Sequence, residues 1–213
     1  MKLYTYFRSS AAFRVRIALN LKGIGYEPVF VHLAKGRHRE SKYSEVNPQA
    51  LLPTLELDDG TRLTQSLAII EWLDEEHPTP PLIPKDPLAR ARVRSLSYLV
   101  ASEIHPLNNL RVLQYFERDW GVPQPERDVW VRHWITEGFS AFEALLQDHP
   151  STGAFCDGNA PSIADCCLIP QMYNARRFAV DLTFYPTLLR IEEACLALPE
   201  FDAARPERQP DAP

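Results

Sequence analysis

The sequence predicts two domains of different class, a small α/β domain followed by an all-helical domain. Residues 1–80 alternate short strand-like runs with helical patterns, whereas residues after 87 show helical periodicity. Between them, residues 78–87 contain five prolines in ten positions, a density that neither a helix nor a central strand tolerates. We therefore place the α/β domain at 1–80, a proline-rich linker at 81–87 and the helical domain at 88–213.

Residues 1–80 are expected to form a βαβ unit followed by a ββα unit. The first unit has a strand at 3–7, a helix that follows Ser9-Ser10 and stops at Gly23, and a strand at 26–33. Two strands joined by a helix are parallel. After a polar helical stretch at 39–46, a hairpin at 51–63 turns at Asp58-Asp59-Gly60 and precedes a helix at 67–76.

Four helices are expected in the second domain, at about 88–118, 125–147, 162–179 and 187–197. Ser162 and Asp165 have the spacing of a capping box at the start of the third of these helices. The tail at 205–213 is polar and interrupted by proline, which predicts a surface extension.

Composition excludes several classes of protein. The chain has 213 residues, a formal net charge of −5, 45% hydrophobic and 24% charged residues, which is typical of a globular protein. It has no basic block that would favour nucleic acid as a partner, and no run of apolar residues that could cross a membrane. Its first residues do not resemble a signal peptide, so we expect a cytoplasmic protein.

The sequence gives no support for a metal site or a protein disulfide in the first domain. All four cysteines, Cys156, Cys166, Cys167 and Cys195, lie in the last third of the chain. The six histidines are scattered without the spacing of metal ligands. Nucleotide-binding glycine motifs and the serine-hydrolase elbow are also missing.

Two helix starts in the first domain could bind an anion. Ser9 and Ser10 follow the first strand, and Gln65-Ser66 begins the last helix of the domain. Hydroxyls and free backbone amides at a helix N-terminus stabilise negative charge, although such serines also serve as simple helix caps. Leu52-Pro53 lies in a strand-like run, where proline marks a sheet edge or a cis bend.

Several segments along the chain closely resemble the zeta class of the glutathione transferases. They are residues 4–19, which include Ser9 and Ser10, and residues 47–49, 52–55, 65–71, 174–183 and 209–211. The resemblance covers essentially the whole chain and implies a thioredoxin-like domain joined to an all-α domain. It also implies glutathione as the cofactor and a homodimer as the assembly.

The resemblance assigns roles to particular residues. It implies that Ser9 and Ser10 hold the glutathione sulfur, that Leu52 pairs its backbone with the tripeptide beside a cis Pro53, and that Gln65 and Ser66 bind the γ-glutamyl end. Further positions that family members use around glutathione are His38, Gln49, His105, Asn109 and Arg111. Taken alone, a histidine at position 105 is more often a structural residue of a helix.

The family also implies a reaction, the glutathione-dependent cis–trans isomerisation of a maleyl keto acid. Maleylacetoacetate, which would give fumarylacetoacetate, is the first candidate and maleylpyruvate the second. Arg8 and Arg177, with Arg176 or Arg111 as helpers, are the expected anchors of the substrate carboxylates. Surface ion pairs are the alternative use of these arginines.

One residue departs from the zeta pattern. The family usually has Ser-Ser-Cys in the first loop, and here the third position is Ala11. The reactive sulfur must therefore come from glutathione. Two other functions stay open, a general glutathione transferase acting on electrophilic acids and a non-catalytic binding module that keeps the fold.

Overall fold

Four short strands form a mixed sheet in the first of two units. The computed structural model describes residues 1–213, with Met1–Ile83 and Leu196–Pro213 in the first unit and Pro84–Cys195 in the second. The strands are β1 (Lys2–Thr5), β2 (Glu27–Phe30), β3 (Thr54–Glu56) and β4 (Arg62–Thr64), in the order β2-β1-β3-β4. β1 is parallel to β2 and antiparallel to β3, which confirms the expected βαβ unit and hairpin.

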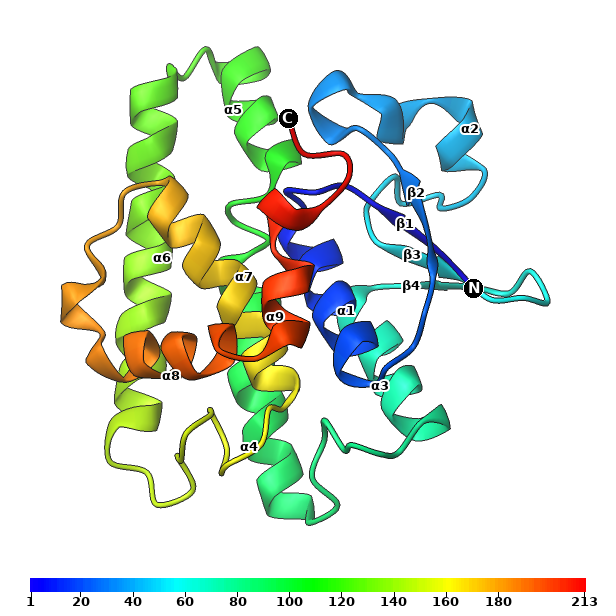
Figure 1. Ribbon diagram of the computed structural model, residues 1–213. Helices are drawn as coiled ribbons and strands as arrows, with labels where there is room; N and C mark the ends of the chain where they lie inside the picture. Colours follow the sequence, from blue (N-terminus) through cyan, green and yellow to red (C-terminus); the bar gives the residue numbers. More distant parts are fainter. The chain divides into compact units, whose positions relative to one another are not determined.

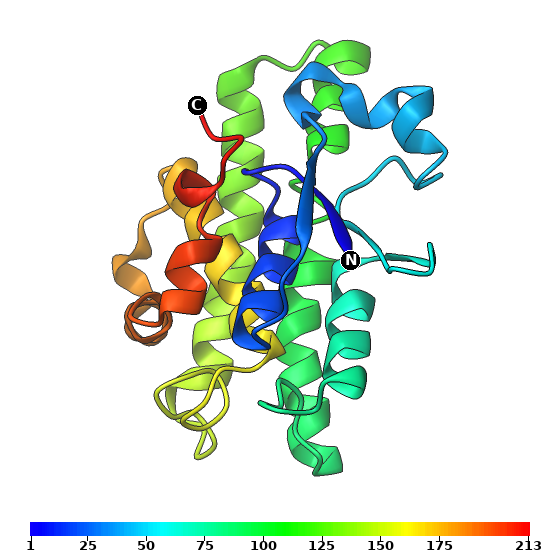
Figure 2. The same ribbon diagram turned by 45° about the vertical axis from the view of Figure 1, so that its right-hand side comes forward.

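Two helices, α1 (Ser10–Leu21) and α3 (Ser66–Glu76), lie side by side on one face of this sheet (Figures 1 and 2). Their buried side chains include Phe13, Ile17, Ile70 and Leu73, none of which is more than 2% exposed. Short helical segments follow β2, namely η1 (Leu33–Lys35), η2 (Arg37–Arg39) and α2 (Ser41–Ser44). The hydrophobic core thus fixes the starts of α1 and α3 relative to the sheet.

Lys22 ties the end of α1 to the segment after α3. Its ammonium donates hydrogen bonds to Asp74 Oδ1 at 2.5 Å, His77 O at 2.6 Å and Pro80 O at 2.5 Å. The Asp74 carboxylate also accepts from the amides of Leu82 and Ile83. The proline-rich segment is therefore hydrogen-bonded to the α/β unit up to residue 83.

The C-terminal segment also belongs to the first unit, whereas the sequence boundaries grouped it with the helices. α9 (Pro199–Ala204) packs against α1, and the short helix η5 (Pro206–Arg208) follows it (Figure 1). Asn20 donates to Glu200 O at 2.9 Å, and Arg16 donates to Ala204 O at 3.1 Å. Buried Phe201 completes this contact. The sequence predicts no helix at 199–204, and local patterns cannot show which domain such a segment packs against.

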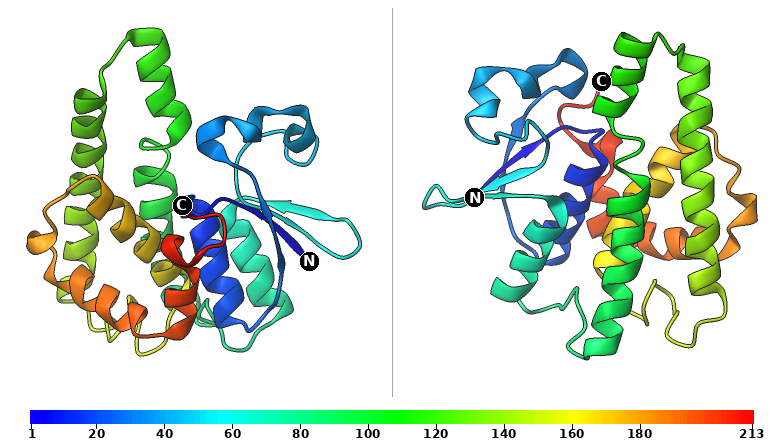
Figure 3. Two further views of the ribbon diagram at one scale, coloured as in Figure 1. Left: turned by 45° about the horizontal axis from the view of Figure 1, so that its top comes forward. Right: turned by 180° about the vertical axis from the view of Figure 1, so that it is seen from behind.

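The second unit is helical throughout. It contains α4 (Pro87–Tyr98), the π-helical segment η3 (Leu99–Ile104), α5 (Leu110–Trp120), α6 (Gln124–Gln147), α7 (Ile163–Arg177), η4 (Leu182–Phe184) and α8 (Pro186–Leu196). α5 and α6 run side by side, joined by a turn at Gly121 with φ of 65° (Figure 3). No helix in the structure is long and apolar enough to cross a membrane.

The expectation of one continuous helix over 88–118 is wrong. The helix passes through η3 and ends at His105, and a new helix starts at Leu110. Pro106 has no amide hydrogen to continue the ladder, and the Asn109 side chain caps α5 by accepting from the Arg111 amide at 3.1 Å. Both signals are in the sequence, but the apolar periodicity continues across the break.

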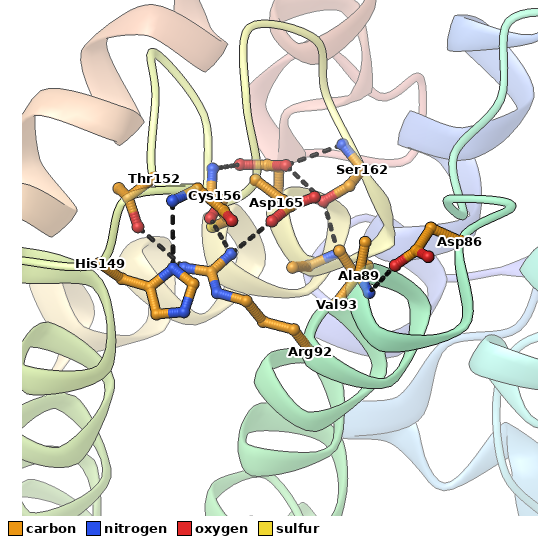
Figure 4. Close-up of polar contacts among 12 residues, drawn as sticks. Asp86, Ala89, Arg92, Val93, His149, Thr152, Cys156, Ser162 and Asp165 are labelled. Carbon is orange, nitrogen blue, oxygen red and sulfur yellow. Dashed lines mark hydrogen bonds and ion pairs between the residues drawn. The ribbon is translucent and has the colours of Figure 1, made fainter.

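Asp165 organises the start of α7 (Figure 4). It is fully buried, and its carboxylate accepts from the Cys156 amide at 2.9 Å, the Ser162 amide at 2.8 Å and the Ser162 hydroxyl at 2.8 Å. The expected capping box is therefore confirmed. From α4, Arg92 donates to Cys156 O at 2.8 Å and Thr152 Oγ1 at 2.8 Å, so the loop before α7 is held from two sides.

Candidate active site

The sheet topology brings several of the expected site residues to one end of the strands. β1 ends where β3 begins, because Tyr4 is opposite Thr54 in the antiparallel pair. β4 ends at the same end of the sheet, because Thr54 is also opposite Thr64. The segments that follow β1 and β4 and the segment that precedes β3 therefore meet there. They carry Ser9-Ser10, Gln65-Ser66 and Leu52-Pro53.

Ser9 is the N-cap of α1, and its hydroxyl oxygen accepts a hydrogen bond from the Ala12 amide at 3.2 Å. The same hydroxyl keeps its hydrogen, which it can donate to an anion. The amides of Ser10 and Ala11 are in the first turn, where the helix provides no acceptor for them. This end of α1 can therefore offer three donors and the positive end of the helix dipole to one negatively charged atom.

The start of α3 places a second group of polar side chains at the same end of the strands. Gln65 precedes the helix with φ of 67° and ψ of 116°, an uncommon conformation for a residue other than glycine. Its side-chain nitrogen Nε2 donates to Gln49 Oε1 at 3.0 Å, and this bond joins two of the residues expected to bind glutathione. Ser66 is buried and accepts from the Arg14 guanidinium at 3.2 Å.

Arg14 lies beside this second polar group, and sequence analysis gave it no role. It is 2% exposed and reaches from α1 to the first residue of α3. A buried guanidinium beside a helix N-terminus adds positive charge where a carboxylate could bind. Its presence in the motif at 4–19 was the available signal, but its partner is 52 residues away in the sequence.

Leu52 and Pro53 directly precede β3. Their peptide bond is cis, as the resemblance implied. The preceding carbonyl, Leu51 O, accepts from the Tyr43 hydroxyl at 2.7 Å and from Asn47 Nδ2 at 2.8 Å. The backbone groups of Leu52 itself form no hydrogen bond within the chain. They can therefore pair with an extended peptide through main-chain hydrogen bonds.

His38 and Gln49 differ in their surroundings. His38 is 7% exposed, and its Nδ1 atom has no hydrogen-bond partner in the chain. Burial, followed by the charge of Arg39, lowers the pKa of His38 below its usual value. Gln49 is exposed, and its backbone amide donates to Asn47 Oδ1 at 3.0 Å. His38 can thus act as a neutral hydrogen-bonding group near neutral pH.

The remaining candidates for glutathione lie in the second unit, at the break between η3 and α5. His105 ends the π-helical segment, Asn109 is the N-cap of α5 and Arg111 is in its first turn. Asn109 therefore has a structural task, although its amide nitrogen can still donate.

The expected carboxylate anchors are in different situations. Arg176, at the end of α7, forms an ion pair with Glu192 of α8. Arg177 is exposed, lies over the Phe178 ring at 4.8 Å and donates to Asn174 Oδ1 at 3.5 Å. Arg8 in the first unit is exposed and lies 5.6 Å from the Phe7 ring centre. Arg176 has the ion pair that was the alternative to substrate binding, whereas Arg8 is exposed beside the Phe7 ring and Arg177 contacts Asn174 and the Phe178 ring.

The first unit contains no cysteine, and the four thiols of the chain are all buried. Burial raises the pKa of the Cys156 thiol, and the neighbouring Asp165 carboxylate raises it further. None of these sulfur atoms can act as an exposed nucleophile. The donors around Ser9 therefore suit a sulfur anion brought by another molecule.

Comparison with known proteins gives consistent similarities. Residues 8–76 match the family model described as the glutathione S-transferase N-terminal domain. The chain is 47% identical over 213 residues to the maleylpyruvate isomerase of Ralstonia sp, with 100% of both chains covered. Two solved structures, each covered completely, are also similar. One is a holo maleylpyruvate isomerase described as a bacterial zeta-class glutathione S-transferase (46% identity, TM-score 0.98), and the other a maleylacetoacetate isomerase from Methylobacterium extorquens AM1 with bound malonate and GSH (44% identity, TM-score 0.97).

Proposed function

The chain belongs to the zeta class of the glutathione S-transferase family, and we propose that it catalyses the glutathione-dependent cis–trans isomerisation of a maleyl keto acid. Maleylacetoacetate is the first candidate substrate, with fumarylacetoacetate as its product. The observation that carries the proposal is the geometry of Ser9. Its hydroxyl oxygen is fixed by the Ala12 amide while its hydrogen stays available to a sulfur anion.

Bound glutathione supplies a thiolate whose reversible addition makes the substrate's cis double bond single, so that the bond can rotate. The Ser9 hydroxyl and the amides of Ser10 and Ala11 favour the ionised form of that sulfur, because each donates toward negative charge at a helix N-terminus. The same kind of preorganised donor stabilises negative charge that develops during the reaction. The chain itself provides no sulfur for this step.

The other polar groups of the first unit suit the remainder of the tripeptide. Leu52 offers an unpaired backbone N–H and C=O beside Pro53, which suits an extended peptide. Gln65 and Ser66, with the Arg14 guanidinium bonded to Ser66, suit the charged γ-glutamyl end. His38 and Gln49 are assigned further glutathione contacts, and His105, Asn109 and Arg111 are assigned the same role from the family resemblance.

Arginine is suited to the substrate because both ends of a maleyl keto acid are carboxylates. We assign carboxylate binding to Arg8 and Arg177, which are both exposed residues. Arg176 is the weaker candidate, because Glu192 already pairs with its guanidinium.

Maleylpyruvate is the second candidate substrate, and two similar proteins support it. The Ralstonia relative and one of the two solved structures are maleylpyruvate isomerases, while the other structure is a maleylacetoacetate isomerase. The two substrates differ only at the keto end. The deciding experiment measures rates on both substrates side by side, with and without glutathione. A rate that does not depend on glutathione would refute the proposed reaction.

Two other functions give different results in the same experiments. A general transferase would convert small α-halo acids at least as fast as maleyl compounds. A non-catalytic binding module would convert neither, and failure to bind immobilised glutathione would favour it. We further propose that the protein is a cytoplasmic homodimer, which light scattering and cell fractionation test.

A further inference from the structure

The C-terminal tail holds the backbone that leads into the Ser9 helix start. Asp211 Oδ2 accepts a hydrogen bond from the Phe7 amide at 2.9 Å, although the two residues are 204 positions apart. Phe7 lies between the end of β1 at Thr5 and the N-cap Ser9. The tail was expected to be only a surface extension, and this contact gives it a place in the architecture of the site.

A buried arginine holds the same backbone from the other side. Arg16 is fully buried on α1, and its guanidinium donates to Thr5 Oγ1 at 3.1 Å, Tyr6 O at 3.4 Å and Phe7 O at 3.0 Å. Burial lowers the pKa of Arg16 to about 10, and the Asp211 carboxylate acts in the opposite direction. Arg16 is therefore charged near neutral pH, and Asp211 helps to balance that charge.

The turn itself adds one more bond, from the Ser9 amide to Tyr6 O at 2.9 Å. The carbonyls of Tyr6 and Phe7 and the amides of Phe7 and Ser9 are thus all paired within the first unit. The bond to Asp211 differs from the others because its acceptor is a carboxylate, and hydrogen bonds to charged groups are the stronger ones. Its loss would free the Phe7 peptide, two residues before the hydroxyl that we assign to the sulfur.

We propose that Asp211 is a positioning residue for the glutathione site, acting through the Phe7 amide to hold the turn that presents Ser9. This inference rests on the function proposed above. Asp211 itself does not contact the reacting atoms. Without a hydrogen-bond acceptor at position 211 the turn occupies the binding-competent conformation for only a fraction of the time, and the apparent dissociation constant of glutathione rises by the inverse of that fraction.

Three variants of the full chain separate this role from general destabilisation. Asp211→Ala removes the acceptor, and Asp211→Asn removes the charge but keeps an oxygen that can accept from the Phe7 amide. Glu207→Gln is the matched control, because Glu207 is an exposed carboxylate of the same tail whose only ion pair is with Arg205 at 3.6 Å. Glutathione affinity is measured by calorimetry below the melting temperature of each variant. Exchange of the Phe7 amide hydrogen is followed by mass spectrometry.

We expect Asp211→Ala to weaken glutathione binding by about tenfold and to speed exchange of the Phe7 amide. In Asp211→Asn and Glu207→Gln the dissociation constant of glutathione should stay within about threefold of the value for the unchanged protein, since both variants keep an acceptor oxygen at position 211 for the Phe7 amide. Unchanged affinity in Asp211→Ala would overturn the inference. So would an equal loss in Asp211→Asn, or a loss of affinity without faster exchange at Phe7.

The result can be distinguished from failure of the proposed reaction. Glutathione affinity and amide exchange are measured without any maleyl substrate. If the unchanged protein binds glutathione but does not isomerise maleyl acids, the proposed reaction fails while the comparison between Asp211 variants still decides the positioning role.

Discussion

Ser9 and Ala12 are joined by a hydrogen bond from the Ala12 amide to the Ser9 hydroxyl oxygen, at 3.2 Å. This bond caps α1 and also orients the hydroxyl that we assign to the glutathione sulfur. One side chain thus caps the helix and, in the proposed reaction, also contributes to chemistry, and the two contributions can be measured separately.

Replacement of Ser9 by alanine should lower turnover by roughly 100-fold or more, because a donor to developing negative charge is lost. It should also lower the free energy of unfolding by about 1 kcal/mol, the usual effect of losing an N-cap. Steady-state kinetics and urea unfolding measure the two effects. Asp86→Ala is the matched control, because Asp86 caps α4 by accepting from the amides of Leu88 and Ala89. It should lose stability and keep turnover, and unchanged turnover in Ser9→Ala would remove Ser9 from the mechanism.

Replacement of Arg177 by alanine should raise the KM for the maleyl substrate roughly tenfold or more, because a charge-assisted contact to a carboxylate is lost. Arg190→Ala is the control, because Arg190 is an exposed arginine of α8 that donates to Gly153 O at 2.8 Å and has no assigned role at the site, so its loss should leave KM nearly unchanged. Arg176→Ala breaks the ion pair with buried Glu192, so it should lower the melting temperature and raise KM less than Arg177→Ala does. Equal KM values for the Arg177 variant and the unchanged protein would assign Arg177 to the surface.

Treatment of the folded protein with iodoacetamide, followed by removal of the reagent, should leave glutathione-dependent turnover intact. All four cysteines are buried, and burial raises the pKa of Cys156 and Cys195, so little reactive thiolate forms. Mass spectrometry should detect no alkylation of the folded chain and alkylation of all four thiols after unfolding in urea. Rapid inactivation would show that a protein thiol takes part.

His38 should make stability depend on pH. Its pKa in the folded protein lies below the ordinary value, so the unfolded chain binds a proton more readily. Its contribution to stability is therefore complete above the unfolded pKa of about 6.5 and is lost as pH falls through the folded pKa. In His38→Gln, the difference in unfolding free energy between about pH 7.5 and pH 5.5 should be smaller than in the unchanged protein. An identical pH dependence would contradict this.

Lys22→Met should lower the free energy of unfolding by about 3 kcal/mol, because it leaves the largely buried Asp74 carboxylate without its cation. Lys2→Met is a suitable comparison. Lys2 is half exposed and lies 3.9 Å from Glu56, so its loss should change stability by less than about 1 kcal/mol. Urea unfolding monitored by circular dichroism measures both. Similar effects for the two lysines would show that the cluster around Asp74 adds no stability beyond a surface pair.

Features that depend on near neighbours were predictable from the sequence. The N-cap role of Ser9 and the capping box of Ser162 and Asp165 follow from residues three positions apart. The parallel pairing of β1 and β2 follows from the helix between them. The single helix expected at 88–118 was wrong. The apolar periodicity that correctly predicts other helices continues across Pro106 and Asn109, where the helix is interrupted.

The sequence by itself determined the fold class, the family and the helix starts at Ser9 and Ser66, because caps, turns and periodicity are properties of short segments. Only the tertiary structure decided that Arg14 bonds to Ser66, that Asp211 holds the Phe7 amide, and that the segment after Leu196 packs with the α/β unit. These partners are separated by 52 to 204 positions. Chain collapse around a common core brings them together, and no local pattern records which distant group will satisfy a buried donor.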